Sequence, residues 1–468
     1  MGERGRTIAV IGGGLAGIAA ALRCADAGLA VVLLEVRPRL GGAAYSVSKN
    51  GLTIDNGQHV FLRCCTAYRA LLARIGSESR VRLQERLEIP LLRCGQPPFL
   101  LRRSRLPAPL HLASALMRFP ELTGLQRVRA GIAAAALQRL DQADPALDEV
   151  SFRDWLSAHR QDQASVSALW DLFVLPTVNL RSEHASLAVC AFVFQQGLLD
   201  SAEAGDIGFH LAPLQQTIGE PALQELRRSG VEVHCGWRVS EVGRHADGIE
   251  VRGRSSAGQQ TLQADAAILA LPHLRAAALL EREAATLAQR IAGIGVSPIV
   301  NLHVLYDRRV TELPFAAGIR SPVQYIFDRT LAGGAPAGTQ YLAVSLSGAE
   351  QEMALTAPQL RERFLPEIAR LLPAAAGAQV LEFIVTREHA ATFRASPGSG
   401  GRRPGPLTPV PGLMLAGAWT ATGWPATMEG AVRSGETAAD AVIAHLRSLA
   451  DAPHSSLGRA PRVVGASR

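Results

Sequence analysis

TIAVIGGGLAGIAAALRCADAGLAVVLLE, residues 7–35, decides the fold. A short apolar run at 7–11 leads into a glycine-rich turn, and an alanine-rich stretch at 15–27 leads into a second apolar run at 30–35. This order predicts strand, helix and strand, which together form a βαβ unit. Within it, Gly12, Gly14 and Gly17 form the pattern Gly-x-Gly-x-x-Gly, and Glu35 ends the second strand about twenty residues later. We therefore predict an α/β protein with a Rossmann-like dinucleotide-binding domain.

Each residue of this pattern has a physical reason. Gly12 permits the tight turn, Gly14 lets the backbone approach a pyrophosphate, and Gly17 lets the helix pack against the strand. The positive end of the helix attracts the phosphates. We expect Glu35 to bind the adenosine ribose hydroxyls.

Composition excludes several classes of protein. A length of 468 residues allows two or three domains. The six cysteines show no metal-ligand spacing, so we predict no metal site and a reducing, cytoplasmic compartment. No run reaches the roughly 18 to 20 apolar residues of a spanning helix, and we interpret the N-terminus as carrying no export signal. The net charge of +7 comes from scattered arginines and aromatic residues are 5%, which disfavours nucleic-acid binding.

A second glycine pair follows Glu35. The segment VRPRLGG contains Arg37, Arg39, Gly41 and Gly42 and continues the loop instead of starting a helix. In this the chain resembles the superfamily of flavin-containing amine oxidases and phytoene desaturases. The resemblance implies FAD as the cofactor, with the arginines and the glycine pair wrapping the pyrophosphate and the flavin end.

Two further segments extend the resemblance. Residues 413–446 read as a buried strand, a glycine turn and a long helix that begins near Met428 and Glu429. In the superfamily this helix points at the flavin, and an Asp follows the turn glycine; here Ala418 follows Gly417, which puts that one contact in doubt. In the middle of the chain, residues 230–253 read as a strand and a hairpin, and the resemblance implies a backbone contact of Val239 with adenine.

The FAD domain is therefore expected to be discontinuous, built from residues 1–90, 220–290 and 405–450. Residues 91–219 and 291–404 should form an inserted α+β substrate domain, and residues 451–468 read as a disordered tail. The residues expected to bind FAD are Gly12, Gly14, Leu15, Ala16, Gly17, Glu35, Arg37, Arg39, Gly41, Gly42, Gly57, Val239, Gly417, Ala418, Met428 and Glu429.

DNGQHVF, residues 55–61, concentrates polar side chains in an aliphatic chain. The resemblance implies that Gly57 lets the backbone approach the flavin ring, and that Gln58 and His59 emerge beside it. His59 titrates nearest neutrality, so it is the candidate proton donor, with an interior, hydrogen-bonded histidine as the equal alternative. We interpret Asp55 as a turn cap.

Within the superfamily the chain most resembles the hydroxysqualene dehydroxylase family, on motifs that include DNGQHVF and GWPATMEGAVRSG. The resemblance implies reductive removal of an allylic hydroxyl from hydroxysqualene, giving squalene, in squalene and hopanoid synthesis. His59, relayed through Gln58 or water, is the expected acid, and Glu429 is the weaker candidate. Trp419 and Trp424 are expected to line the substrate pocket, with ordinary packing as the alternative.

Three alternatives stay open. A carotenoid-type desaturase would pass electrons in the opposite direction, from the isoprenoid into FAD. An amine oxidase is disfavoured because the branch uses a lysine near the flavin, whereas Lys49 is the only lysine. A non-enzymatic prenyl-lipid carrier would hold no flavin. Expected partners are an isoprenoid lipid, an electron donor such as a pyridine nucleotide or a reductase, other squalene-synthesis enzymes, and the inner face of the cytoplasmic membrane as a peripheral contact.

Overall fold

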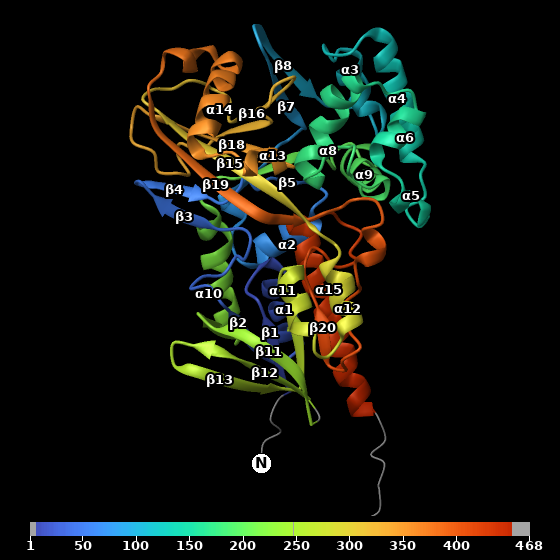
Figure 1. The fold of residues 1–468 in the computed structure, drawn as a ribbon, viewed down its shortest axis with the longest axis vertical. Coiled ribbons are helices and arrows are strands. Elements are labelled where there is room, and N and C mark those ends of the chain that lie inside the picture. The colour runs from blue at the N-terminus through green and yellow to red at the C-terminus, as the bar shows by residue number, and fades with distance from the viewer. Residues whose placement is uncertain (1–5, 247, 452–468) are drawn as a thin grey trace, which may run out of the picture.

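A computed structural model describes residues 6–246 and 248–451 (Figure 1). Apart from residue 451, the tail predicted at 451–468 lies outside the described residues. The molecule is elongated, with a narrower part that contains the N-terminal strands and a wider part above it (Figure 1).

A five-stranded parallel sheet forms the narrower part and confirms the predicted α/β fold. Its strands, in spatial order, are β10 (Glu232–Cys235), β2 (Ala30–Glu35), β1 (Thr7–Ile11), β14 (Ala266–Leu269) and β20 (Leu413–Leu415). The central strands are almost continuously buried, as expected of a parallel sheet that is covered on both faces. Strand β1 therefore pairs with β2 of its own βαβ unit on one side and with β14 on the other, and β20 follows β14.

Helices α1 (Leu15–Asp26) and α15 (Met428–Asp451) pack against each other beside this sheet (Figure 1). Their approach is close because Gly435 of α15 has no side chain: a Cβ there would collide with the backbone of Ala16. Helices from the N-terminal and the C-terminal parts of the chain thus meet near the glycine turn that precedes α1. A three-stranded antiparallel sheet of β11 (Arg238–His245), β12 (Gly248–Ser255) and β13 (Gly258–Ala264) lies at the far end of the narrower part (Figure 1).

A seven-stranded mixed sheet dominates the wider part. Its spatial order is β19 (Val380–Phe393), β15 (Val296–Tyr306), β18 (Gln340–Ser347), β17 (Tyr325–Asp328), β16 (Phe315–Gly318), β7 (Glu88–Arg93) and β8 (Gln96–Arg102). Helix α14 (Ala357–Leu371) packs on this sheet, and α3 (Ala113–Met117), α4 (Gly124–Gln138), α8 (Asp171–Val178) and α9 (Leu187–Phe194) form a helical layer beside it (Figure 1). Strand β7 crosses the domain boundary expected at residue 90, and the domain limits themselves stay predictions.

Two small sheets lie between the larger parts. One pairs β3 (Ser46–Lys49) with β4 (Leu52–Asp55). The other has the order β5 (Phe61–Leu62), β9 (Ile207–His210) and β6 (Val81–Leu83). The polar stretch DNGQHVF runs from the end of β4 into β5, so the fold sets it between both parts of the molecule.

Candidate active site

The glycine turn after β1 is held by backbone contacts that only glycine permits. Gly12 has φ +112° and donates to Leu34 O at 2.8 Å. Gly41 donates to Gly13 O at 2.9 Å, which brings the second glycine pair onto the first turn. Gly42 has φ +58°, and a Cβ on it would lie 2.7 Å from Gly14 Cα. The two glycine segments therefore form one close-packed cradle at the N-terminus of α1, where Leu15 and Ala16 are buried.

Glu35 connects this cradle to the strands. Its buried carboxylate accepts from Gly13 N at 2.6 Å and Arg37 N at 2.7 Å. The carbonyl of Glu35 accepts from Trp237 N at 2.9 Å, and the indole Nε1 of Trp237 is a buried donor without a partner among the described residues. Val239 follows in β11 and is buried. The residues expected at the adenosine end of the cofactor are thus adjacent, with a free donor beside them.

Arg39 provides a second free donor at the cradle. Its guanidinium lies 3.8 Å over the ring of Tyr45, and its Nη1 is buried without a partner in the described part of the chain. The pKa of Arg39 is lowered, and burial is the largest cause. Arg37, by contrast, is exposed. A buried, unsatisfied guanidinium donor beside a glycine cradle fits an anionic pyrophosphate, so the residues present fit FAD.

The loop after β20 is held by an arginine that the sequence analysis missed. Gly417, with φ +145°, donates to Ser434 Oγ at 2.8 Å. Buried Arg403 donates to Thr420 O at 2.6 Å and Trp424 O at 2.8 Å, and its guanidinium lies 4.6 Å from the ring of Phe393. No carboxylate pairs with Arg403 among the described residues, and burial lowers its pKa to about 10. The loop at Ala418 is therefore held by a buried cation.

Met428 begins α15, as expected, but the adjacent Glu429 does not cap its own helix. The fully buried Glu429 carboxylate accepts from Ala67 N at 3.1 Å and Tyr68 N at 2.7 Å, the first turn of α2 (Thr66–Arg74). It also accepts from Arg433 Nε at 2.7 Å. With these partners Glu429 holds α2 against α15, and this occupation of both oxygens argues against a role as proton donor.

Asp55 is part of a buried ion pair, so its interpretation as a turn cap was wrong. The carboxylate accepts from Arg329 Nη2 at 2.7 Å and from Ser46 Oγ at 2.6 Å. It also accepts from Leu214 N at 3.0 Å. These partners lie up to 274 positions away in the chain, so local sequence could not indicate them.

Gln58 and His59 line a small cavity at the junction of the two parts. The other lining residues are Asp55, Val60, Phe209, His210, Leu214, Phe327 and Arg329. The Gln58 Nε2 is a buried donor without a partner among the described residues. Burial lowers the pKa of His59, and the charge of Asp55 opposes that shift. A Cβ on Gly57 would lie 3.4 Å from His59 Nε2, which is an ordinary van der Waals contact.

His210 lines this cavity from β9, whereas its place in the polar segment EAGDIGFH predicts a surface or capping role. It is buried; its Nε2 lies 2.7 Å from Tyr68 Oη and its Nδ1 lies 2.7 Å from the carbonyl oxygen of His59. Arg329 Nη1 donates to His210 O at 2.7 Å. Burial lowers the pKa of His210 to about 3, so it is neutral at pH 7 and fixes the backbone at His59.

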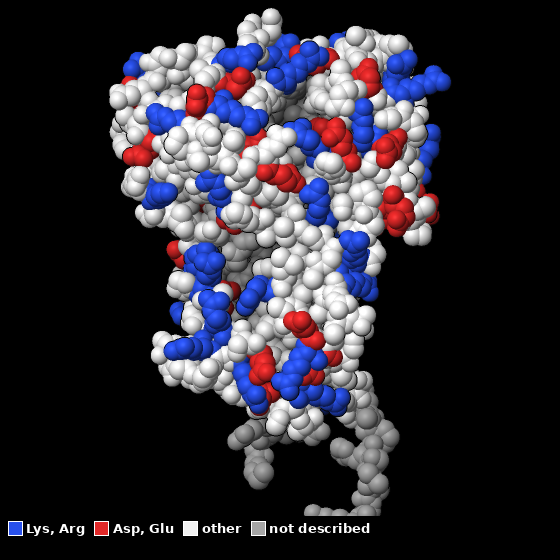
Figure 2. All heavy atoms as spheres, viewed as in Figure 1, with Lys and Arg blue, Asp and Glu red and all other residues white. Residues whose placement is uncertain are grey.

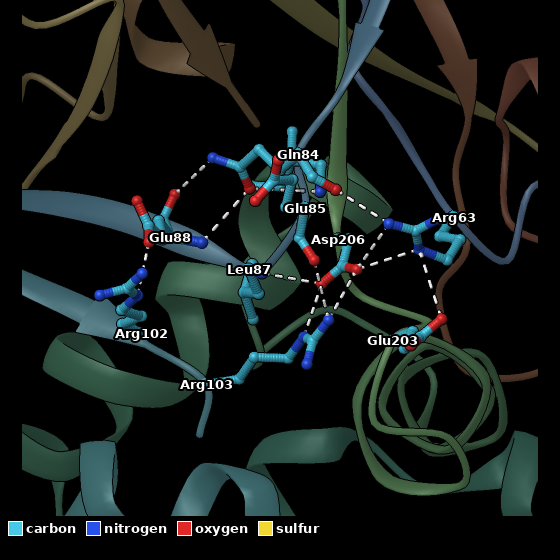
Figure 3. A network of polar contacts seen from close by, with 10 residues as sticks. Arg63, Gln84, Glu85, Leu87, Glu88, Arg102, Arg103, Glu203 and Asp206 are labelled. Carbon is cyan, nitrogen blue, oxygen red and sulfur yellow. Dashed lines mark hydrogen bonds and ion pairs between the residues drawn. The ribbon is translucent and has the colours of Figure 1, made fainter. Parts of the chain in front are cut away.

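Asp206 belongs to the same segment, EAGDIGFH, but is fully buried between two arginines (Figure 3). Arg103 Nε lies 2.7 Å and Arg63 Nε 2.9 Å from its carboxylate, and Leu87 N donates to it at 2.7 Å. This network joins β5, β7 and the start of β9. The network supports the strands structurally. Only burial distinguishes Asp206 from a solvated carboxylate, and burial cannot be read from the local sequence.

Strand β15 contributes two polar residues, Asn301 and His303, which the sequence analysis did not identify as site residues. Asn301 Nδ2 donates to Asn56 O at 2.9 Å, beside the backbone of Gly57. His303 Nδ1 lies 2.7 Å from Tyr341 Oη, and burial lowers the pKa of His303 to about 3. Both positions face the same side of the strand, and polar residues at that spacing in PIVNLHVLY were the available signal.

The two tryptophans differ in environment. Trp419 is buried and its Nε1 donates to Leu271 O at 2.8 Å, so packing alone accounts for its position. Trp424 is half-buried and meets Phe192 of α9 edge to face, with ring centroids 5.2 Å apart. Trp424 therefore contacts the helical layer of the wider part, and its role toward substrate stays a prediction.

Comparison with known proteins adds a family and relatives. The model of the family "Flavin containing amine oxidoreductase" matches residues 15–443. The chain is 28% identical to the hydroxysqualene dehydroxylase of Zymomonas mobilis over 93% of this chain and 99% of the relative, and 28% identical to that of Rhodopseudomonas palustris over 94% and 99%. It is also 25% identical to the zeta-carotene desaturase of Synechocystis over 94% and 98%.

Solved structures share the fold. Cyclohexylamine oxidase from Brevibacterium oxydans has a TM-score of 0.69 at 18% identity, covering 95% of this chain and 100% of that one. A putrescine oxidase variant redesigned in its cofactor binding has a TM-score of 0.69 at 20% identity, covering 94% and 99%. In the described part of the chain, no helix has the length and apolar character needed to cross a membrane.

Proposed function

The chain belongs to the flavin containing amine oxidoreductase family, and we propose that it removes the hydroxyl group of hydroxysqualene reductively to give squalene. It is an FAD-dependent oxidoreductase. The observation that carries the proposal is the similarity over more than nine tenths of the chain to several hydroxysqualene dehydroxylases.

The residues that would hold FAD form a continuous path. The glycine cradle and the free donor of Arg39 would receive the pyrophosphate, and Glu35 with Val239 would receive the adenosine. The loop at Gly417, Ala418 and the start of α15 would receive the flavin end, where the helix dipole favours negative charge. Reduced FAD supplies the two electrons and the hydrogen that replace the hydroxyl group.

The protein must also protonate the departing hydroxyl, which leaves as water. His59 is the proposed donor, because it lines the cavity at the junction and has no side chain of the described residues within hydrogen-bond distance of its imidazole. Gln58, with its free Nε2, is proposed to orient the hydroxyl or a relaying water. Burial lowers the pKa of His59, so its imidazole becomes protonated only at a lower pH than an exposed histidine would.

A zeta-carotene desaturase activity is the second candidate, since such enzymes are also among the relatives. Desaturation would transfer a hydride to FAD and release a proton to a base, and its hydrocarbon substrate has no polar group for the free Gln58 Nε2 to bind. The polar cavity at Gln58 and His59 therefore favours dehydroxylation over desaturation.

We further propose that the electron donor is a pyridine nucleotide or a separate reductase, and that the protein works with other squalene-synthesis enzymes at the inner face of the cytoplasmic membrane. An isoprenoid of this size is almost insoluble in water, so a substrate supply from lipid is expected.

Product analysis tests the proposed reaction. Reduced enzyme is incubated with hydroxysqualene and oxidised enzyme with phytoene or zeta-carotene, and the products are identified by mass spectrometry. Squalene from the first incubation and no dehydrogenated product from the second is the expected result. The reverse pattern would assign a desaturase.

A further inference from the structure

The helical layer of the wider part exposes an unusual set of apolar side chains. In the described part of the chain, six of the seventeen exposed large hydrophobic residues fall within residues 106–132. Their exposed fractions range from 50% for Leu106 to 64% for Ile132. We call this set the apolar surface; its members are Leu106, Leu110, Met117, Leu125, Val128 and Ile132.

Half of the apolar surface lies along one side of α4. Leu125, Val128 and Ile132 are spaced i, i+3 and i+7, so they form a stripe on the helix. Ala130, Ala133 and Leu137 of the same helix are buried and form the face that packs on the core. Helix α4 is therefore apolar on both its inner and its outer side, and packing within the chain explains only the inner one.

Helix α3 and the segment before it carry the remaining residues of the apolar surface. A Cβ on Gly131 would meet the side chain of Leu116 at 3.7 Å, so α3 and α4 are in contact, and Met117 follows Leu116. The loop before α3 carries Leu106 and Leu110. Both helices lie at the same end of the molecule, away from the parallel sheet (Figure 1).

The charge around the apolar surface is strongly biased. Residues 100–139 contain seven arginines and a single carboxylate, Glu121. Arg103 is buried against Asp206 and Arg102 pairs with Glu88, which leaves five arginines for the surface. The Glu121 carboxylate is already engaged, since Arg320 Nε lies 3.0 Å from it. Arg105 and Arg118 are exposed and adjoin the apolar residues. In Figure 2 the upper right part, where α3 and α4 lie, shows basic side chains at its edge, with some acidic side chains nearby.

We propose that the apolar surface docks on a bilayer that contains anionic lipid, with its side chains in the acyl region and the arginines at the head groups. Large side chains on one side of helices, flanked by cations and without a net acidic rim, fit a lipid interface. A protein partner of matching shape would need an acidic rim of its own. The docking site deepens the proposed function, on which it rests, by giving a water-insoluble isoprenoid a route from the bilayer.

Vesicle binding by the full-length, FAD-loaded protein tests this site. The probes are vesicles of phosphatidylcholine alone and vesicles with phosphatidylglycerol added, and co-sedimentation gives the apparent Kd. Wild-type protein is expected to bind the anionic vesicles more tightly, and added salt should weaken that binding. The double variant Val128→Asp/Ile132→Asp should bind at least about tenfold more weakly, because burial of each side chain contributes on the order of a factor of ten.

Leu331→Asp is the matched control, because Leu331 is 95% exposed and lies outside the apolar surface. It should bind as wild type. Equal binding by the double variant and the control would overturn the proposal, as would no binding by wild type. A wild-type dimer in analytical ultracentrifugation that Val128→Asp/Ile132→Asp dissociates would also overturn it and assign the surface to a second copy of the chain.

An activity assay separates this proposal from the proposed function. The double variant should convert hydroxysqualene dispersed in detergent at the wild-type rate and lose turnover only with substrate in vesicles. No squalene from wild type in detergent would overturn the proposed reaction, and vesicle binding would still report on the docking site.

Discussion

The glycine cradle and the cavity at His59 would each position a reacting molecule, the cofactor in the first and the substrate in the second, but different groups determine their shapes. In the cradle, Gly12 to Gly42 arrange backbone groups that lie within about 30 positions of one another, and the absence of side chains determines the shape. At the cavity, Asp55, His59, His210 and Arg329 come from distant parts of the chain and side chains determine the shape. Shape in the first region thus depends on sterics, and in the second on charge and hydrogen bonds.

The largest expected effect tests the steric half of this comparison. Gly42→Val places a β-branched side chain at φ +58° with its Cβ 2.7 Å from Gly14 Cα, so the two glycine segments must separate. We expect the purified variant to lack the flavin absorption band and to have no activity. Gly377→Ala is the control, because nothing lies within 4 Å of the Cβ it adds. A yellow, active Gly42→Val protein would show that the cradle does not hold the cofactor.

The second prediction separates chemistry from cofactor binding. His59→Gln should lower the rate of dehydroxylation by about 100- to 10,000-fold, the usual contribution of a positioned acid. Bound FAD per chain should stay at the wild-type value, since the cradle is untouched.

The pH profile checks the same assignment. His59 must be protonated to act, so the wild-type rate should fall as the pH rises through a pKa that burial holds below the ordinary value of His. That limb should disappear in His59→Gln. A wild-type rate that increases with pH over the same interval would exclude His59 as the acid.

The third and smallest effect concerns stability. Arg329→Met leaves the buried Asp55 carboxylate without its cation and should cost about 3 to 5 kcal/mol of unfolding free energy in urea titrations. Arg282→Met removes an exposed partner of Glu241 and should cost less than about 1 kcal/mol. Similar values for the two variants would mean that the cavity wall does not depend on its buried ion pair.

The same contrast explains what the sequence could predict. Strands β1 and β2, helix α1 and the start of α15 were predicted nearly to the residue because local periodicity and glycine spacing determine them. The α/β fold was confirmed for the same reason, whereas FAD was implied by the resemblance and is confirmed by the family match.

The side-chain partners were not predictable in the same way. The roles of Asp206 and His210 depend on burial and on arginines or a tyrosine that are more than 100 positions away. Arg403 donates to carbonyls of the loop after β20, although nothing around residue 403 in the sequence indicates that contact. The domain limits and the individual site residues remain predictions.

The central claim is that electrons pass from the flavin held by the glycine cradle to an alcohol-bearing isoprenoid. Anaerobic mixing of light-reduced enzyme with hydroxysqualene tests it directly, with flavin absorbance and squalene measured in the same sample. The account predicts return of the oxidised flavin band with one squalene formed per FAD. A flavin that stays reduced while hydroxysqualene remains intact would contradict it.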